Sequence, residues 1–175
     1  CGAHVGRITA VLAVRGVVVH AFEPNPHAFA ILAARFEGVE NVHCHEQAVS
    51  TDAGRAQLHL HVLADEDPVG RAVGSSLLTS KRNVSNERFV EVETVDLAAF
   101  LAGLERPAAL LKLDVEGVEL AILERLAHNG LLEQIRHVLV EMHDRSSAGG
   151  FVPAGQVVRS LLAEPRFAHV QLDWD

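Results

Sequence analysis

A continuous apolar run, Val17-Val18-Val19-His20-Ala21-Phe22, decides the fold of this chain. The run is rich in β-branched valine, which predicts a strand buried on both faces, and such strands are typical of parallel sheets. Glu23 follows directly, and Pro24 and Pro26 then break the chain. A carboxylate therefore stands at the carboxyl end of the predicted strand, where open α/β sheets bind their ligands.

Segments with helix and strand patterns alternate along the rest of the chain. Residues 56–63 and 89–95 alternate between apolar and polar side chains, which predicts two half-exposed strands, each antiparallel to a neighbour. The other predicted strands lie at residues 42–49, 108–113, 135–140 and 167–174. The predicted helices cover residues 7–15, 27–36, 96–101, 117–128 and 153–163. This order predicts an α/β fold with a mostly parallel open sheet and helices on both faces.

A polar segment rich in Gly, Ser and Asn, residues 65–88, separates the two half-exposed strands. A structureless loop of this length is uncommon inside a compact domain, and such loops are often lids or binding loops. We therefore expect this segment to border a ligand.

The composition limits the class of protein. The chain has 175 residues, 49% hydrophobic and 22% charged, which predicts a single globular domain over residues 1–175. Its net charge of −8 argues against nucleic acid as a partner. We identify no apolar run near the roughly 20 residues of a membrane span, and no secretory signal. Cys1 and Cys44 make no disulfide framework, so a reducing cytoplasm is the expected compartment. The oligomeric state stays open.

The start of the chain has the character of a loop between a strand and a helix. Its first residue is Cys1, and its only methionine is Met142. We therefore expect the first strand of the sheet to be missing from this sequence, and the domain to be truncated at its N-terminus.

The glycine turn at residues 2–6 and Glu23 suggest a bound nucleoside. Gly2-Ala3-His4-Val5-Gly6 leads straight into a predicted helix, and glycines let a backbone turn tightly and approach a ligand closely. Glu23 follows at about the 20-residue spacing at which an acid chelates ribose hydroxyls. A solvated carboxylate in a turn is the structural alternative for Glu23.

Acidic residues cluster after the predicted strand at residues 108–113. Asp114, Glu116 and Glu119 follow within six residues, and Lys112 lies inside the apolar run. A lysine there must pair or reach the rim of the sheet, because an unpaired buried charge is costly. Capping of the next helix can explain one of the acids, but it explains the group and Lys112 poorly.

A further strand end, after residues 135–140, carries Glu141, Met142 and His143. A histidine there is a candidate general base, since its ordinary pKa lies near neutral pH. A purely structural histidine is the alternative. If the fold prediction is right, the polar groups at these strand ends converge, and their convergence carries more weight than any single motif.

Two histidine pairs raise the question of a metal. His43 and His45 share one predicted strand face, and His59 and His61 share another. Four imidazoles could bind zinc, but polar residues at every second position are typical of the exposed face of a strand. We therefore predict no metal site, and we predict that Cys44 is a small core residue.

Several stretches together match a known family. They are Gly2-Ala3-His4-Val5-Gly6 with Thr9, Ala21-Phe22-Glu23-Pro24-Asn25-Pro26, Ala48-Val49-Ser50, Ser75-Ser76-Leu77, Val95-Asp96-Leu97 with Phe100, Leu111-Lys112-Leu113-Asp114-Val115-Glu116-Gly117-Val118-Glu119 and Val140-Glu141-Met142-His143. In these stretches the chain resembles the FkbM-like family of S-adenosylmethionine-dependent methyltransferases. His4 departs from the pattern, because the family usually has Asn there.

The resemblance implies a Rossmann-like methyltransferase fold, the cofactor S-adenosyl-L-methionine and methyl transfer, usually to a hydroxyl of a small molecule. It implies that the catalytic work falls to Asp114, Glu116 and His143, and it does not say which of them is the base. The cofactor-binding residues it implies are Gly2, Ala3, His4, Gly6, Glu23, Gln47, Ala48 and Asp114. Residues 65–88, with Ser75 and Ser76, would cover the acceptor. Sugars, polyketides, lipids and peptides all stay open as acceptors.

Two functions of other classes stay open beside methyl transfer. A nicotinamide-dependent oxidoreductase would share the glycine turn and the ribose-binding acid. The turn lacks the full Gly-x-Gly-x-x-Gly pattern that lets a pyrophosphate approach, which argues against that class. A non-catalytic nucleoside-binding domain is the other alternative, and an assay for methyl transfer separates it.

Overall fold

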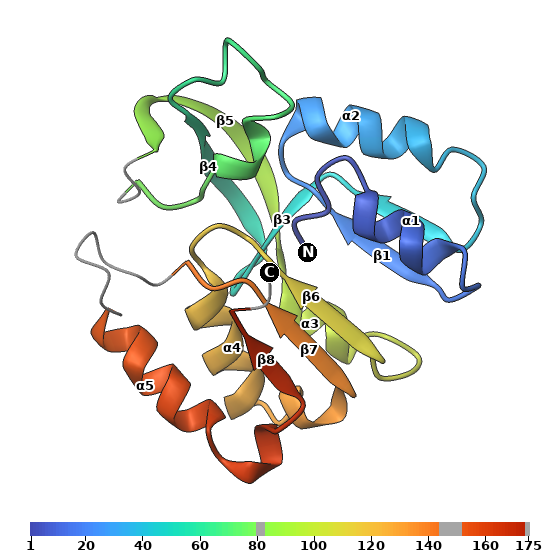
Figure 1. The fold of residues 1–175 in the computed structure, drawn as a ribbon, viewed down its shortest axis with the longest axis vertical. Coiled ribbons are helices and arrows are strands. Elements are labelled where there is room, and N and C mark those ends of the chain that lie inside the picture. Colours follow the sequence, from blue (N-terminus) through green and yellow to red (C-terminus); the bar gives the residue numbers. More distant parts are fainter. Residues whose placement is uncertain (80–82, 144–151, 174–175) are drawn as a thin grey trace. The chain divides into compact units, whose positions relative to one another are not determined.

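The computed structural model describes residues 1–79, 83–143 and 152–173 (Figure 1). It shows a mixed α/β protein with five α-helices in the described part, which confirms the predicted class. The chain forms two compact units. Residues 1–49 with 54–94 make the first unit, and residues 50–53 with 95–175 make the second. Within the described residues, no helix is long and apolar enough to cross a membrane.

The first unit begins with two helices and two strands that alternate along the chain. Its helices are α1 (Arg7–Ala13) and α2 (Pro26–Arg35), and its strands β1 (Val19–Phe22) and β2 (Val42–His45) pair in parallel. The Asn25 side chain accepts the N–H groups of His27 and Ala28, and Pro26 occupies the first turn, so α2 begins at a strong helix start signal. Leu32 and Phe36 then pack against Ala21 of β1 in one hydrophobic cluster.

Gly6 joins the glycine turn to this cluster. The residue caps α1 in a left-handed conformation with φ 79°, which glycine adopts without steric cost. A Cβ atom there would lie 2.6 Å from a ring carbon of Phe36 and 2.7 Å from a methyl of Leu32. Both the backbone and the packing therefore require glycine at position 6.

A three-stranded sheet follows, formed by β3 (Gln47–Ser50), β4 (Gly54–His61) and β5 (Val84–Asp96) in the order β3-β5-β4. Gly54 lies opposite Thr94, and the β4–β5 pairing confirms the prediction of antiparallel strands. Strand β5 begins at Val84 rather than at residue 89, and a 3-10 turn, η1 (Ala72–Gly74), lies inside the segment predicted to be structureless. That loop is therefore shorter than predicted, and its residues 80–82 lie outside the described residues.

The second unit contains a three-stranded parallel sheet. Its strands are β6 (Leu110–Leu113), β7 (His137–Val140) and β8 (Val170–Leu172), in that spatial order. Helix α4 (Glu119–His128) connects β6 to β7, and α5 (Pro153–Leu162) comes before β8. Helix α3 (Leu97–Ala102) precedes the sheet and begins at Asp96, as predicted. The last strand was predicted to reach residue 174, which lies outside the described residues.

The expected single open sheet is wrong for this structure. Hydrogen bonds join the described strands into three sheets, of which two are parallel and the third contains the antiparallel pair β4–β5. One physical cause is that the predicted strand at residues 42–49 is interrupted at Glu46, so β2 pairs with β1 while β3 joins β5. The run at residues 17–22 is likewise not buried throughout, because Val17 and Val18 are exposed and only Val19–Phe22 is a strand.

His59 corrects the predicted exposed face of β4. The residue is 5% exposed, and its Nδ1 lies 3.1 Å from the carbonyl oxygen of Ser85. Its backbone also pairs with Ser76 in an isolated antiparallel bridge. The segment that contains Ser76 therefore pairs with an edge of β4. Among the described residues, neither His59 nor His61 belongs to a group able to hold a metal.

Three histidines stack across β1 and β2. His20 lies opposite His43 with ring centroids 4.9 Å apart, and its Nδ1 is 3.1 Å from Nε2 of His45. Burial lowers the pKa of His20 and of His45, and the charge of His43 lowers both further. The folded protein therefore favours the neutral form of these imidazoles.

This histidine stack should make the first unit sensitive to acid. When a folded-state pKa lies below the unfolded value, the unfolded chain binds protons first, so the free energy of unfolding decreases as pH falls through about 6.5. His20→Phe keeps an aromatic ring but removes one titrating group, so it should lose less stability between pH 7.5 and 5.5 than the wild type does. Urea unfolding at both pH values measures this loss. His27→Phe, an exposed position on α2, is the control, and an equal loss in His20→Phe and wild type would contradict the prediction.

Candidate functional site

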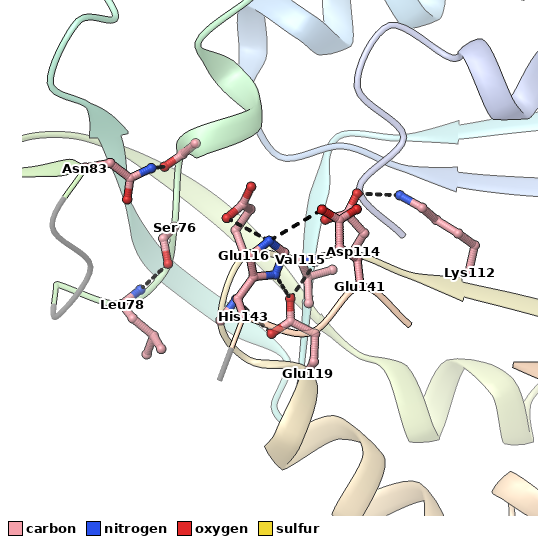
Figure 2. Close-up of polar contacts among 12 residues, drawn as sticks. Ser76, Leu78, Asn83, Lys112, Asp114, Val115, Glu116, Glu119, Glu141 and His143 are labelled. Atoms are coloured by element: carbon pink, nitrogen blue, oxygen red, sulfur yellow. Dashed lines mark hydrogen bonds and ion pairs between the residues drawn. The ribbon is translucent and has the colours of Figure 1, made fainter. Parts of the chain in front are cut away.

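An acid–imidazole cluster follows β6 and β7 in the second unit (Figure 2). Leu113 and Val140 end these neighbouring parallel strands at the same register position, and the N–H of Glu141 donates to the carbonyl of Leu113 at 2.9 Å. The residues that follow the two strands are therefore held at one edge of the sheet. The structure brings the predicted Asp114, Glu116 and His143 together there, with Glu119 and Glu141.

His143 has a carboxylate at each of its ring nitrogens. Nδ1 lies 2.8 Å from Oε1 of Glu119, and Nε2 lies 3.3 Å from Oε2 of Glu116. Oε1 of Glu141 is 4.0 Å from Nε2. The Glu119 side chain at Nδ1 is only 2% exposed, whereas those of Glu116 and Glu141 at Nε2 are 21% and 46% exposed, so Nε2 faces the more accessible side of the cluster.

Glu119 is the site residue whose role sequence reasoning missed. It lies in the first turn of α4 and accepts the N–H groups of Val115 at 3.1 Å and Gly117 at 2.9 Å. Burial alone would raise the pKa of Glu119, but the hydrogen bond and charge of His143, with the Gly117 N–H, hold this pKa below its usual value. The sequence did show an acid beside a glycine at a helix start, but not that it would be buried against a histidine 24 residues away.

Lys112 and Asp114 form an ion pair at the end of β6. Lys112 Nζ lies 2.5 Å from Oδ2 of Asp114, and the side chains are 15% and 23% exposed. This pair confirms that a lysine inside the apolar run needs a partner. The positive charge of Lys112 also offsets the negative charge of Asp114 in the cluster.

The cluster holds an excess of negative charge. Burial raises the pKa of Glu141, and the charges of Asp114 and Glu116 raise it further, against the opposing effects of His143 and Lys112. Within the described residues, Asp114, Glu141 and His143 are the group whose ligand-type atoms approach within 4.8 Å of one another, close enough to share a cation. Lys112 and His143 already partner these carboxylates, so nothing in the arrangement requires an ion.

The loop from β6 to α4 places Glu116 by an unusual backbone conformation. Glu116 has φ 61° and Gly117 has φ 133°. A left-handed conformation is rare for a residue with a Cβ atom, and it occurs most often where a side chain must be held for function. Here it accompanies the placement of the Glu116 carboxylate beside Nε2 of His143.

A second group of predicted residues lies in the first unit, around Glu23. This side chain is buried, with 6% of the residue exposed. Its Oε2 accepts the N–H of His4 at 2.8 Å, and its Oε1 accepts the N–H of Asn25 at 2.9 Å. Burial raises the pKa of Glu23, although these two backbone hydrogen bonds oppose the shift. The carboxylate is thus not solvated, and it ties the glycine turn to the end of β1.

The glycine turn itself is strongly curved. Gly2, His4 and Gly6 all have positive φ, and Ala3 donates its N–H to the carbonyl of Phe22 at 2.9 Å. Nε2 of His4 lies 2.7 Å from the carbonyl oxygen of Val69. The turn therefore contacts both the end of β1 and the polar segment, and it brings the predicted turn residues into one group with Glu23.

The remaining predicted residues lie on β3 and in the polar segment. The amide of Gln47 donates to Glu93 at 3.3 Å, and Ala48 is buried in the core with Leu58 and Val92. Ser76 is buried and its Oγ accepts the N–H of Leu78, whereas Ser75 Oγ is buried with no hydrogen-bond partner in the described structure. Gln47 and Ala48 thus have structural partners that sequence reasoning did not predict.

The sequence matches a family model described as the methyltransferase FkbM domain. The match covers residues 1–169 of the 175 residues and so includes parts of both compact units. No curated protein and no solved structure matches the chain.

Proposed function

The chain belongs to the FkbM methyltransferase family, and from that premise we propose that it is an S-adenosylmethionine-dependent methyltransferase acting on a hydroxyl of a small molecule. The observation that carries the hydroxyl assignment is the acid–imidazole cluster after β6 and β7, because a hydroxyl must lose a proton when it is methylated. His143 has one ring nitrogen on the accessible side of that cluster. Two cysteines, too few for a disulfide framework, support a cytoplasmic location.

The residues around Glu23 fit the ribose of this cofactor. Each Glu23 oxygen accepts one backbone hydrogen bond, and a carboxylate oxygen can accept a second. A ribose hydroxyl is a donor of the right kind for that second position. The sharply curved turn at Gly2, Ala3, His4 and Gly6 supports a ligand that approaches the backbone. We therefore assign ribose binding to Glu23, with Gln47 and Ala48 bordering the adenine.

The cofactor supplies a methyl group on a positively charged sulfur, which is already a good electrophile. The work left to the protein is to align the acceptor oxygen with that methyl and to take its proton. Asp114, Glu116 and His143 are the candidates for the second task. Asp114 is paired with Lys112, and Glu116 faces the imidazole, so His143 is the best-placed proton acceptor.

Binding and turnover experiments test this function directly. The protein is titrated by calorimetry with S-adenosylmethionine, its demethylated product and NAD. It is then incubated with methyl-labelled cofactor and a panel of hydroxylated sugars, polyketides, lipids and peptides. We expect binding of the first two ligands and label transfer to at least one acceptor. Binding of NAD alone would indicate the oxidoreductase, and cofactor binding without transfer to any acceptor would favour a binding domain.

A further inference from the structure

Glu119 makes one contact that its helix does not explain. The N–H groups of Val115 and Gly117 close the turn before α4, and an acid at a helix N-terminus commonly accepts such bonds. The contact with His143 Nδ1 instead links the start of α4 to the residues after β7. It places an almost fully buried carboxylate, 2% exposed, against one nitrogen of the imidazole.

This contact is shorter and more buried than the 3.3 Å contact of Nε2 with Glu116, so Glu119 has the stronger claim on the single ring hydrogen of a neutral His143. An ionised carboxylate can only accept hydrogen bonds, so Nδ1 must be the donor at 2.8 Å. In a neutral imidazole with hydrogen on Nδ1, the lone pair lies on Nε2. The other groups near His143 come from three elements: Glu116 before α4, Glu141 after β7, and the Lys112–Asp114 pair at the end of β6. Of these, Glu116 and Glu141 face Nε2 directly.

We propose that Glu119 is a positioning residue that holds His143 in the Nδ1–H tautomer, so that Nε2 is the atom that takes the proton of the acceptor. This inference rests on the proposed methyl transfer. As the oxygen–methyl bond forms and the sulfur–methyl bond breaks, the electron pair of the latter stays on sulfur. The acceptor proton moves to Nε2, and the resulting imidazolium is stabilised by Glu119 before it releases a proton to water.

Nitrogen-15 NMR of imidazole-labelled protein tests the tautomer without turnover. The His143 signals are assigned by their loss in His143→Asn, and spectra are taken at a pH above the His143 titration. In the wild type we expect hydrogen on Nδ1 and none on Nε2. Glu119→Gln should yield a mixture of tautomers, whereas Glu124→Gln, an exposed position on the same helix, should match the wild type. Hydrogen on Nε2 in the wild type overturns the proposal, even if Glu119→Gln does not fold.

Steady-state kinetics test the catalytic part. Glu119→Gln should lower kcat about 100-fold or more while the acceptor KM changes less than about threefold, since the base is misplaced rather than the substrate. The acidic limb of its pH–rate profile should move to lower pH, because a carboxylate no longer stabilises the imidazolium. Glu119→Asp keeps the charge and should recover at least about tenfold of the loss.

The outcomes separate this proposal from the proposed function. Equal rates in Glu119→Gln and Glu124→Gln, with His143→Ala inactive, would leave methyl transfer standing and overturn the role of Glu119. A wild-type protein that transfers no methyl group overturns the proposed function and the catalytic part of this inference, while the NMR spectra still decide the tautomer.

Discussion

Methyl transfer by the His143→Ala variant is expected to be about 10²–10⁴-fold slower than by the wild type, the usual effect of removing a general base. The physical reason is the position of Nε2 on the accessible side of the cluster, with Nδ1 held by a buried carboxylate. The cofactor dissociation constant should stay within about threefold, because His143 belongs to the proton-transfer group and not to the ribose contact. Single-turnover rates and calorimetric titration measure the two quantities.

Comparison variants make this result specific. His128→Ala, an exposed position at the end of α4, is the control and should keep the wild-type rate. Asp114→Asn and Glu116→Gln report on the other two candidate bases. If all three site variants turn over within a factor of about three of the wild type, none of these three side chains acts as the base, and alignment of the substrates accounts for the rate.

Glu23→Ala is expected to lose both cofactor affinity and stability. The proposed charge-assisted hydrogen bonds to ribose would contribute roughly 1.5–3 kcal/mol each, so S-adenosylmethionine should bind at least about tenfold more weakly. The N–H groups of His4 and Asn25 also lose their acceptor, and each unsatisfied buried group costs about 1–3 kcal/mol. Calorimetric titration and urea unfolding measure the two losses.

The control for this variant is Glu46→Ala, an exposed acid between β2 and β3, which should change neither quantity. Glu23→Gln keeps the size of the side chain and should retain part of the stability while still weakening the cofactor. A Glu23→Ala protein that unfolds at a lower urea concentration but binds S-adenosylmethionine normally would limit Glu23 to holding the glycine turn.

Local signals in the sequence predicted local structure well. Asp96 was expected to cap a helix, and its side chain accepts the N–H groups of Ala98 and Ala99 at the start of α3. The cap works through residues two and three positions away, so no distant part of the chain is needed to recognise it. The residues that follow β6 and β7 were likewise predictable, because parallel neighbours bring their ends to one edge.

Features that depend on distant contacts could not be predicted in the same way. Strand β3 pairs with β5 instead of continuing β2, and this pairing joins segments that are far apart in sequence. A hydrophobic pattern does not say which strand is the partner. His59 has the spacing of an exposed residue but is buried, and its ring contacts the carbonyl oxygen of Ser85 and the ring of Phe89 on β5. Glu119 resembles a simple helix cap until His143 is placed beside it.

Glu116 also sets a trade-off between stability and activity. Its left-handed backbone, with φ 61°, costs a residue other than glycine roughly 1–2 kcal/mol. Glycine would relieve that strain and at the same time delete the carboxylate that faces Nε2 of His143. A selection for thermal stability alone would therefore favour glycine at position 116. The variants that it enriched would be more stable, but they would lack the carboxylate beside the proposed proton acceptor.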